Sequence, residues 1–426
     1  MRNKIFRSEV LVVFLWLCAS CSVSLKIVGE DPETDSERTA IDPLTDAANP
    51  SHPVLRWRKE QAATRQKAQW AIESKRARDA VDKISSGPYF SCATNLKKEI
   101  KCWGSSLNGA TGRDPSGVDK VNYFESYSGQ VRKIASSQTH TCVLANDSKL
   151  TCHGNNISGQ LGDGTSDSTF KPVSPLGSAS DISWVGVNSN RTCAINRVGD
   201  LKCWGSGYSK TPEAAFSQLG PIVSVAMGSG HSCLQDANFS AQCWGLNLKG
   251  QLGLASISVP STSAPFIVDG LTSGVIQVAV GSEHSCALLA GGAVKCWGGN
   301  SRGQLGNGTT EDQKSPVEVT GLQSGVTAIA LGNEHSCALM SGGGIKCWGL
   351  NSSGQLGDGS NENRNVPTNV VGLSAAIVNL SAGPQFTCAI DKDSTAWCWG
   401  ENDIFNQLGN GTGTDSNVPV KVSNFN

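Results

Sequence analysis

Short stretches of alternating hydrophobic and polar residues recur along the chain, separated by glycine-rich turns. Between residues 275 and 322 they include VIQVAV (275–280) and KSPVEV (314–319). A period of two is typical of half-buried β-strands. The chain also contains 48 glycines and only 3 methionines, a composition that suits many short strands joined by tight turns. We therefore expect about four antiparallel strands in each such stretch of sequence and little helix.

Fourteen of the 16 cysteines form pairs whose members lie ten positions apart. Zinc sites draw on Cys-x2-4-Cys knuckles and redox sites on Cys-x-x-Cys, and neither spacing occurs among these fourteen. The pairs are Cys92 and Cys102, Cys142 and Cys152, Cys193 and Cys203, Cys233 and Cys243, Cys286 and Cys296, Cys337 and Cys347, and Cys388 and Cys398.

A hairpin explains the spacing of ten. In CALLAGGAVKC (286–296) a turn at Ala290–Gly292 places Leu288 opposite Val294 and Cys286 opposite Cys296. Directly opposed cysteines at a non-hydrogen-bonded position are close enough for a disulfide. We predict one disulfide in each hairpin; the alternative is that some pairs are free thiols buried between structural units.

The first cysteines of successive pairs are separated by 50, 51, 40, 53, 51 and 51 residues, which indicates a repeat array or ring. Each unit carries variants of H-[ST]-C-A-L, G-x-x-K-C-W-G, N-x-x-G-Q-L-G and P-x-x-V. This signature resembles the RCC1 (regulator of chromosome condensation) repeat, in the cysteine-containing form of exported bacterial proteins. The resemblance covers residues 81–426 and implies an all-β, seven-bladed β-propeller.

The ends of the repeat region bear on how such a ring closes. Residues 80–93 align with residues 325–338, so the first repeat has the strand that precedes its hairpin, whereas no such strand follows the last repeat. We therefore expect residues 81–87 to pair with the C-terminal blade and close the ring.

Units one, three and seven depart from the pattern. Unit one has Gly109–Gly112 in place of Gly-Gln-Leu-Gly, unit three replaces the turn with GSGYSKTPEAAFSQLGP, and unit seven carries ENDIFNQLG. Irregular loops on a regular scaffold are candidate binding sites; neutral drift of tolerant loops is the alternative.

Four histidines, each two positions before the first cysteine of a pair, could suggest a metal ring. They are His140, His231, His284 and His335, and the equivalent residues are Phe90, Arg191 and Phe386. A position that accepts Phe and Arg favours a packing role. Segments such as Gly162–Thr165 are similarly interpreted as tight turns and not as calcium loops. We expect no metal, no cofactor and no catalytic residue, since no nucleophile elbow, His-Glu-x-x-His or phosphate loop occurs.

The first 20 residues have the pattern of a signal peptide, with basic residues before an apolar run from Val10 to Leu17. The run is too short to span a bilayer as a helix. Ala19–Cys21 is similar to the end of a bacterial lipobox, so we expect lipidation of Cys21; ordinary cleavage nearby is the alternative.

Two segments of opposite charge follow. Residues 21–51 contain an acidic stretch at 29–46 with a net balance of −6, which predicts a disordered linker. Residues 52–80 carry a balance of +5 without glycine, which predicts a basic helix. That helix is either a solvated spacer or strut, or contacts anionic lipid or a partner.

A formal net charge of −1 gives no general attraction to nucleic acid. We expect a monomeric, exported or lipid-anchored protein of the bacterial cell envelope, on the outer membrane, in the periplasm or at the cell surface. It would bind proteins through one rim of the propeller without being an enzyme. The alternatives are an envelope enzyme acting on glycan or peptidoglycan at the central channel, and a guanine-nucleotide exchange activity, which export disfavours.

Overall fold

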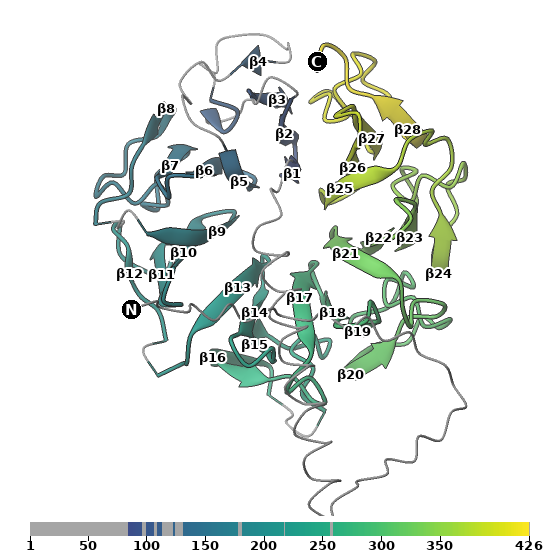
Figure 1. Ribbon diagram of the computed structural model, residues 1–426, viewed down its shortest axis with the longest axis horizontal. Coiled ribbons are helices and arrows are strands. Elements are labelled where there is room, and N and C mark those ends of the chain that lie inside the picture. The colour runs from purple at the N-terminus through teal and green to yellow at the C-terminus, as the bar shows by residue number, and fades with distance from the viewer. Residues whose placement is uncertain are drawn as a thin grey trace, which may run out of the picture. The chain divides into compact units, whose positions relative to one another are not determined.

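The computed structural model describes residues 84–425 apart from 96–98, 106–108, 113–121, 124–130, 178–180, 217 and 256–258. These residues form seven separate four-stranded antiparallel sheets, the blades of a ring (Figure 1). The described residues contain no α-helix. The predicted seven-bladed β-propeller is confirmed.

Each blade is built from one continuous stretch of chain, and its first strand lines the central channel. Blade 1 contains β1 (Ile84–Ser86), β2 (Phe90–Thr94), β3 (Ile100–Gly104) and β4 (Asn122–Tyr123). Blade 2 contains β5 (Val131–Ser136), β6 (His140–Ala145), β7 (Leu150–Gly154) and β8 (Thr169–Val173). Blade 3 contains β9 (Ile182–Asn188), β10 (Arg191–Asn196), β11 (Leu201–Gly205) and β12 (Glu213–Ala214).

The remaining blades follow the same order. Blade 4 contains β13 (Ile222–Met227), β14 (His231–Asp236), β15 (Ala241–Leu246) and β16 (Ser261–Ile267). Blade 5 contains β17 (Val275–Val280), β18 (His284–Leu289), β19 (Val294–Gly298) and β20 (Gln313–Glu318). Blade 6 contains β21 (Val326–Leu331), β22 (His335–Met340), β23 (Ile345–Gly349) and β24 (Arg364–Asn369). Blade 7 contains β25 (Ile377–Ala382), β26 (Phe386–Asp391), β27 (Ala396–Gly400) and β28 (Ser416–Lys421).

The middle hairpin of each blade has the register expected from the cysteine spacing. In blade 5, Cys286 lies opposite Cys296 and Leu288 opposite Val294. All seven pairs are joined as disulfides, with Cα atoms 4.1 Å apart in every case. Each disulfide therefore links two neighbouring strands of one blade.

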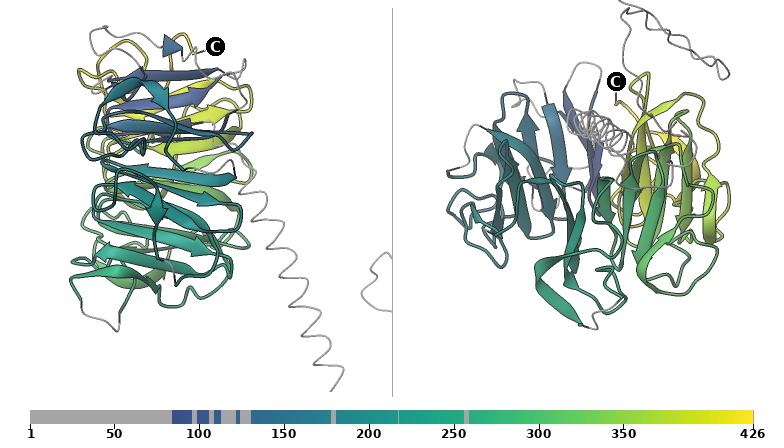
Figure 2. Two further views of the ribbon diagram at one scale, coloured as in Figure 1. Left: turned by 90° about the vertical axis from the view of Figure 1, so that its left-hand side faces the viewer. Right: turned by 60° about the horizontal axis from the view of Figure 1, so that its bottom comes forward.

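The hydrophobic core is divided among the seven junctions between blades. At the junction of blades 5 and 6, for example, Cys286, Leu288 and Leu305 pack with Ile329 and Trp348. An equivalent cluster lies at every other junction, and the disulfides are buried within these clusters. The strands run between the two faces of the ring (Figure 2), and each sheet packs face to face on the sheets of both neighbouring blades.

The ring closes differently from the strand pairing that we expected. β1 pairs with β2 of its own blade, and blade 7 has its own four strands, so among the described residues no sheet combines strands of blades 1 and 7. Blade 1 instead packs on blade 7: Trp103 Nε1 donates to Gln407 O at 3.0 Å and the buried Lys101 donates to Asn424 O at 2.8 Å. The expectation was wrong because β25 already supplies the inner strand of the last blade.

The predicted signal peptide (1–20), lipidation site Cys21, acidic linker (21–51) and basic helix (52–80) all lie outside the described residues, and they stay predictions. Within the described part of the chain, no helix is long and apolar enough to cross a membrane.

Candidate binding surfaces and the latch between blades

The loops that follow the first and third strands of each blade lie on the same face of the ring. Backbone hydrogen bonds join them: Leu246 N donates to Gly230 O at 2.9 Å in blade 4, and Gly299 N donates to Glu283 O at 2.7 Å in blade 5. We call this the CD-loop face, after the loop between the third and fourth strands. The turns between the second and third strands lie on the opposite face, since successive strands are antiparallel.

An asparagine holds each well-formed loop of the CD-loop face, and it is buried in every one of these blades except blade 4, where it is partly exposed. In blade 2 the side chain of Asn156 is fully buried, accepts from Leu161 N at 2.9 Å and donates to Asp163 Oδ1 at 3.0 Å. Asp163 also accepts from Thr165 N at 3.0 Å, so Gly162–Thr165 forms a hydrogen-bonded turn. Equivalent asparagines are Asn247, Asn300, Asn351 and Asn402.

Large apolar side chains project from these pinned loops. Ile157 and Leu248, each directly after the asparagine of its loop, are 74% exposed, and Ile404 in the insertion of unit seven is 86% exposed. In blades 5 and 6 the corresponding residues are Ser301 and Ser352. Large aliphatic residues therefore project from the CD loops of blades 2, 4 and 7, whereas serine occupies the equivalent position in blades 5 and 6.

Sequence reasoning identified only part of this surface. The insertion of unit seven lies on the CD-loop face, whereas much of the irregular loop of unit one falls outside the described residues. Ile157 and Leu248 were missed because units two and four look regular. The available signal was the change from serine to a large aliphatic residue at one fixed position of the repeat.

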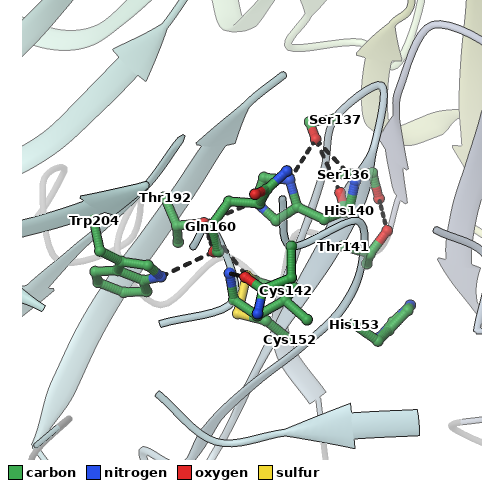
Figure 3. The surroundings of a disulfide bond; sticks show 12 residues. Ser136, Ser137, His140, Thr141, Cys142, Cys152, His153, Gln160, Thr192 and Trp204 are labelled. Atoms are coloured by element: carbon green, nitrogen blue, oxygen red, sulfur yellow. Dashed lines mark hydrogen bonds between the residues drawn. A yellow bond between two sulfur atoms is a disulfide. The ribbon is translucent and has the colours of Figure 1, made fainter. Parts of the chain in front are cut away.

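The histidines of the repeat form latches between neighbouring blades (Figure 3). His140 Nε2 of blade 2 lies 2.7 Å from Thr192 Oγ1 of blade 3. Thr192 Oγ1 donates to Gln160 O at 2.8 Å, and Trp204 Nε1 donates to the same carbonyl at 2.9 Å. The hydroxyl hydrogen is therefore committed to Gln160, and His140 must donate through Nε2.

The same latch recurs at three further junctions. The Nε2 atoms of His231, His284 and His335 lie 2.8, 2.9 and 3.0 Å from the hydroxyl oxygens of Ser285, Ser336 and Thr387, respectively. Desolvation by burial lowers the pKa of His140 and His284 to about 3, and that of His231 and His335 to about 4. These imidazoles are therefore neutral at pH 7 and act as structural donors, in keeping with the packing role inferred from sequence.

Three junctions lack the histidine. Phe90 and Phe386 occupy its place in blades 1 and 7 and are buried. In blade 3, Arg191 turns instead to the CD loop, where its guanidinium lies 5.0 Å from the centroid of the Tyr208 ring and Nε donates to Ser206 O at 3.0 Å. Arg191 thereby adds a cation and an aromatic ring to the CD-loop face.

The central channel opens at both faces. At the CD-loop face a cavity of about 170 Å³ is lined mainly by small residues that follow the inner strands, including Ser86, Gly281 and Pro384. At the opposite end, where the inner strands begin, a cavity of about 410 Å³ is lined by residues of blades 2 to 7. None of the described residues lining either cavity is Asp or Glu, so the converging carboxylates that the envelope-enzyme alternative requires are not found among them. The described residues also contain no cluster of His, Cys, Asp or Glu able to hold a metal ion.

Seven disulfide-linked blades joined by repeated His–hydroxyl–carbonyl latches define a repeat-built β-propeller. One family model of the regulator of chromosome condensation (RCC1) repeat matches residues 243–288, 292–339 and 343–390. A second model of the same repeat matches residues 275–304, 326–355 and 377–407. The chain belongs to the RCC1-repeat family.

Curated relatives have diverse roles. The chain is 30% identical over 301 residues to the mitochondrial RCC1 domain-containing protein RUG3 of Arabidopsis thaliana, covering 66% of this chain and 67% of that one. It is 28% identical to the ultraviolet-B receptor UVR8 of the same plant, covering 68% of this chain and 69% of the receptor. It is 30% identical to the human E3 ubiquitin-protein ligase HERC2, but spans only 6% of that protein.

Solved structures share the fold. The structure of Prp20p from Saccharomyces cerevisiae, described with its binding to Gsp1p and histones, matches with a TM-score of 0.68 and 21% identity, covering 82% of this chain and 89% of that one. Prp20 has also been solved with Kap60 bound. Human WBSCR16 matches with a TM-score of 0.66 and 21% identity, covering 76% and 94% of the two chains. RCC1-like propellers thus include proteins that bind protein partners.

Proposed function

We propose that the protein is a non-enzymatic, exported or lipid-anchored binding module of the bacterial cell envelope that recognises a protein partner through its CD-loop face. The observation that carries the proposal is the set of apolar side chains, Ile157, Leu248 and Ile404, held exposed on that face. Burial of exposed aliphatic side chains against a protein partner is favourable, so these residues are the contact points that we assign to the partner.

The rigidity of the loops supports the proposal. The asparagine before Ile157 and Leu248, and the one two positions before Ile404, ties its loop through hydrogen bonds to the backbone of the following turn. Binding by such loops loses little conformational entropy, because the loops are already ordered before the partner arrives.

The seven disulfides are consistent with an oxidising, extracellular compartment and so support export. Mass spectrometry of the mature N-terminus tests the envelope assignment. A mature chain that begins at a lipid-modified Cys21 is the expected species, and a mature chain that retains residues 1–20 would contradict export.

Site-specific photo-crosslinking tests the binding face. A photoreactive phenylalanine analogue placed at Ile404 or Leu248 in the full chain should give a crosslink to one protein in the envelope of the producing cells. The matched control is Val198, which is 67% exposed in the turn between β10 and β11 on the opposite face. Equal crosslinking from Val198 and Ile404 would contradict the assignment of this face.

Charge substitutions give a second measurement. Ile404→Glu should abolish the crosslink formed at Leu248, because a carboxylate in an apolar contact is costly to desolvate. Its thermal midpoint should match that of the wild type, since the side chain of Ile404 is 86% exposed.

A further inference from the structure

The cavity of about 410 Å³ at the end of the channel opposite the CD-loop face has a lining unlike the rest of the channel. Arg132 and Lys133 of β5 contribute two positive charges, and none of the described lining residues contributes a negative one. Trp184 and the aliphatic residues Val223, Ile276 and Val378 provide apolar surface. The cavity therefore combines positive charge with a hydrophobic wall.

Arg132 is the least satisfied group in this cavity. Arg132 is only partly exposed, yet no described residue forms a hydrogen bond or ion pair with its guanidinium. The other polar side chains are engaged: Gln277 exchanges hydrogen bonds with the backbone of Ile329 at 2.9 and 3.0 Å, and Ser183 Oγ donates to Asn196 O at 2.9 Å. The guanidinium nitrogens of Arg132 are not among the buried atoms without a partner, so they are open to solvent and available to an anion that enters the cavity.

The arginine is also unnecessary for building the blade. In blades 3 to 7 the corresponding positions are Ser183, Val223, Ile276, Thr327 and Val378, so these five blades form with small or uncharged residues there. The charge at Arg132 is therefore a feature of this cavity and not of the propeller architecture.

We propose that this cavity binds a small organic anion, whose carboxylate or equivalent acidic group pairs with Arg132 and whose apolar body lies against the aliphatic wall. The volume suits a compact ligand, since pockets for small molecules span roughly 300–1,000 Å³. Arg–carboxylate pairs are commonly bidentate, which would fix the orientation of the ligand. Lys133, whose Nζ lies 5.7 Å from the centroid of the Trp184 ring, adds to the positive potential.

A matched pair of fluorescent probes tests the proposal on the full chain. 1-Anilinonaphthalene-8-sulfonate has an apolar body and an acidic group, and N-phenyl-1-naphthylamine has the same body without the charge. The sulfonate should bind with one site per chain and at least about tenfold more tightly than the neutral probe, since hydrogen bonds to charged groups contribute about 1.5–3 kcal/mol.

Two substitutions locate the site. Arg132→Ser, which introduces the residue found at the same position in blade 3, should weaken sulfonate binding about tenfold or more and leave the neutral probe within about twofold. Val378→Glu places a like charge at the 46% exposed cavity rim and should weaken the sulfonate selectively.

Lys171→Gln removes one charge from the exposed outer strand of the same blade and should leave sulfonate binding unchanged. Ile404→Glu, which is expected to disturb the protein contact on the CD-loop face, should also leave sulfonate binding in this cavity unchanged. Sulfonate binding unchanged by Arg132→Ser, or equal affinity for the two probes, would overturn the proposal. Loss of binding in Ile404→Glu alone would assign the probe to the other face and overturn it equally.

Discussion

The latch between blades 2 and 3 makes a quantitative prediction. Thr192→Val is nearly isosteric but removes the hydroxyl that accepts from His140 Nε2 and donates to Gln160 O. Gln160 O keeps the hydrogen bond from Trp204 Nε1 at 2.9 Å, so the donor of His140 is the group left unsatisfied. Both His140 and Thr192 are fully buried, and an unsatisfied buried donor costs about 1–3 kcal/mol.

The junction of blades 1 and 2 provides the matched control. Thr141 Oγ1 donates to Ala110 O at 2.8 Å, but the residue in the histidine position is Phe90, which has no polar atom to leave unsatisfied. His153 Nε2 lies 3.1 Å from the same carbonyl and takes the place of the tryptophan. Thr141→Val should therefore be the milder change, and Thr192→Val should lower the free energy of unfolding by about 1–3 kcal/mol more.

Urea denaturation at pH 7, followed by tryptophan fluorescence, measures both free energies. The double variant His140→Phe/Thr192→Val removes both partners of the latch and introduces the phenylalanine that blades 1 and 7 already use. The double variant should recover most of the free energy of unfolding that Thr192→Val loses, because neither member of the pair leaves a buried polar group without a partner. If Thr192→Val and Thr141→Val were equally destabilising, the imidazole would contribute packing alone and the latch would have no energetic role.

Three further predictions concern acid, the disulfides and ring closure. The five buried histidines have folded-state pKa values of about 3 to 4, against 6.5 in the unfolded chain. The free energy of unfolding should therefore be constant above pH 6.5 and fall between pH 6.5 and the folded-state pKa by up to about 1.4 kcal/mol per pH unit for each histidine. Urea denaturation at pH 7 and at pH 4.5 measures this fall, which should be smaller in His284→Phe. Replacing Cys286 and Cys296 together by alanine should lower the free energy of unfolding, measured by calorimetry, by about 2–3 kcal/mol. An unchanged unfolding transition would show that this disulfide does not stabilise the fold. Lys101→Met removes the buried donor to Asn424 O, so amide hydrogen exchange should become faster in β28 of blade 7 than in β16 of blade 4, relative to the wild type. An equal increase in both strands would argue that Lys101 does not act locally where blades 1 and 7 meet.

The local features of the blades were predictable from sequence because they depend on neighbours along the chain. The ten-residue spacing and the glycine turn specify the register of Cys286 with Cys296, and the structure has that register. The period near 50 indicated a ring, and the family signature gave the number of blades. The way in which the ring closes was harder to predict, because the sequence of one repeat does not show whether its first strand belongs to the preceding sheet or to the following one.

The functional surfaces were less predictable because they combine residues from several repeats. His140 and Thr192 are 52 positions apart, and their contact follows only once neighbouring blades are packed face to face. Arg132, Ile276 and Val378 meet in one cavity because the ring brings together strands that are far apart in sequence. A single repeat, however regular, contains none of these sites.

Since every blade is a complete sheet drawn from one uninterrupted stretch of chain, the fold does not depend on which junction between blades contains the break in the chain. Joining residue 425 to residue 84 and cutting the connection between any two other blades would preserve every strand pairing and every disulfide. Circular permutants of the ring are therefore accessible. Duplication or loss of one repeat would change the circumference without requiring any sheet to be rebuilt.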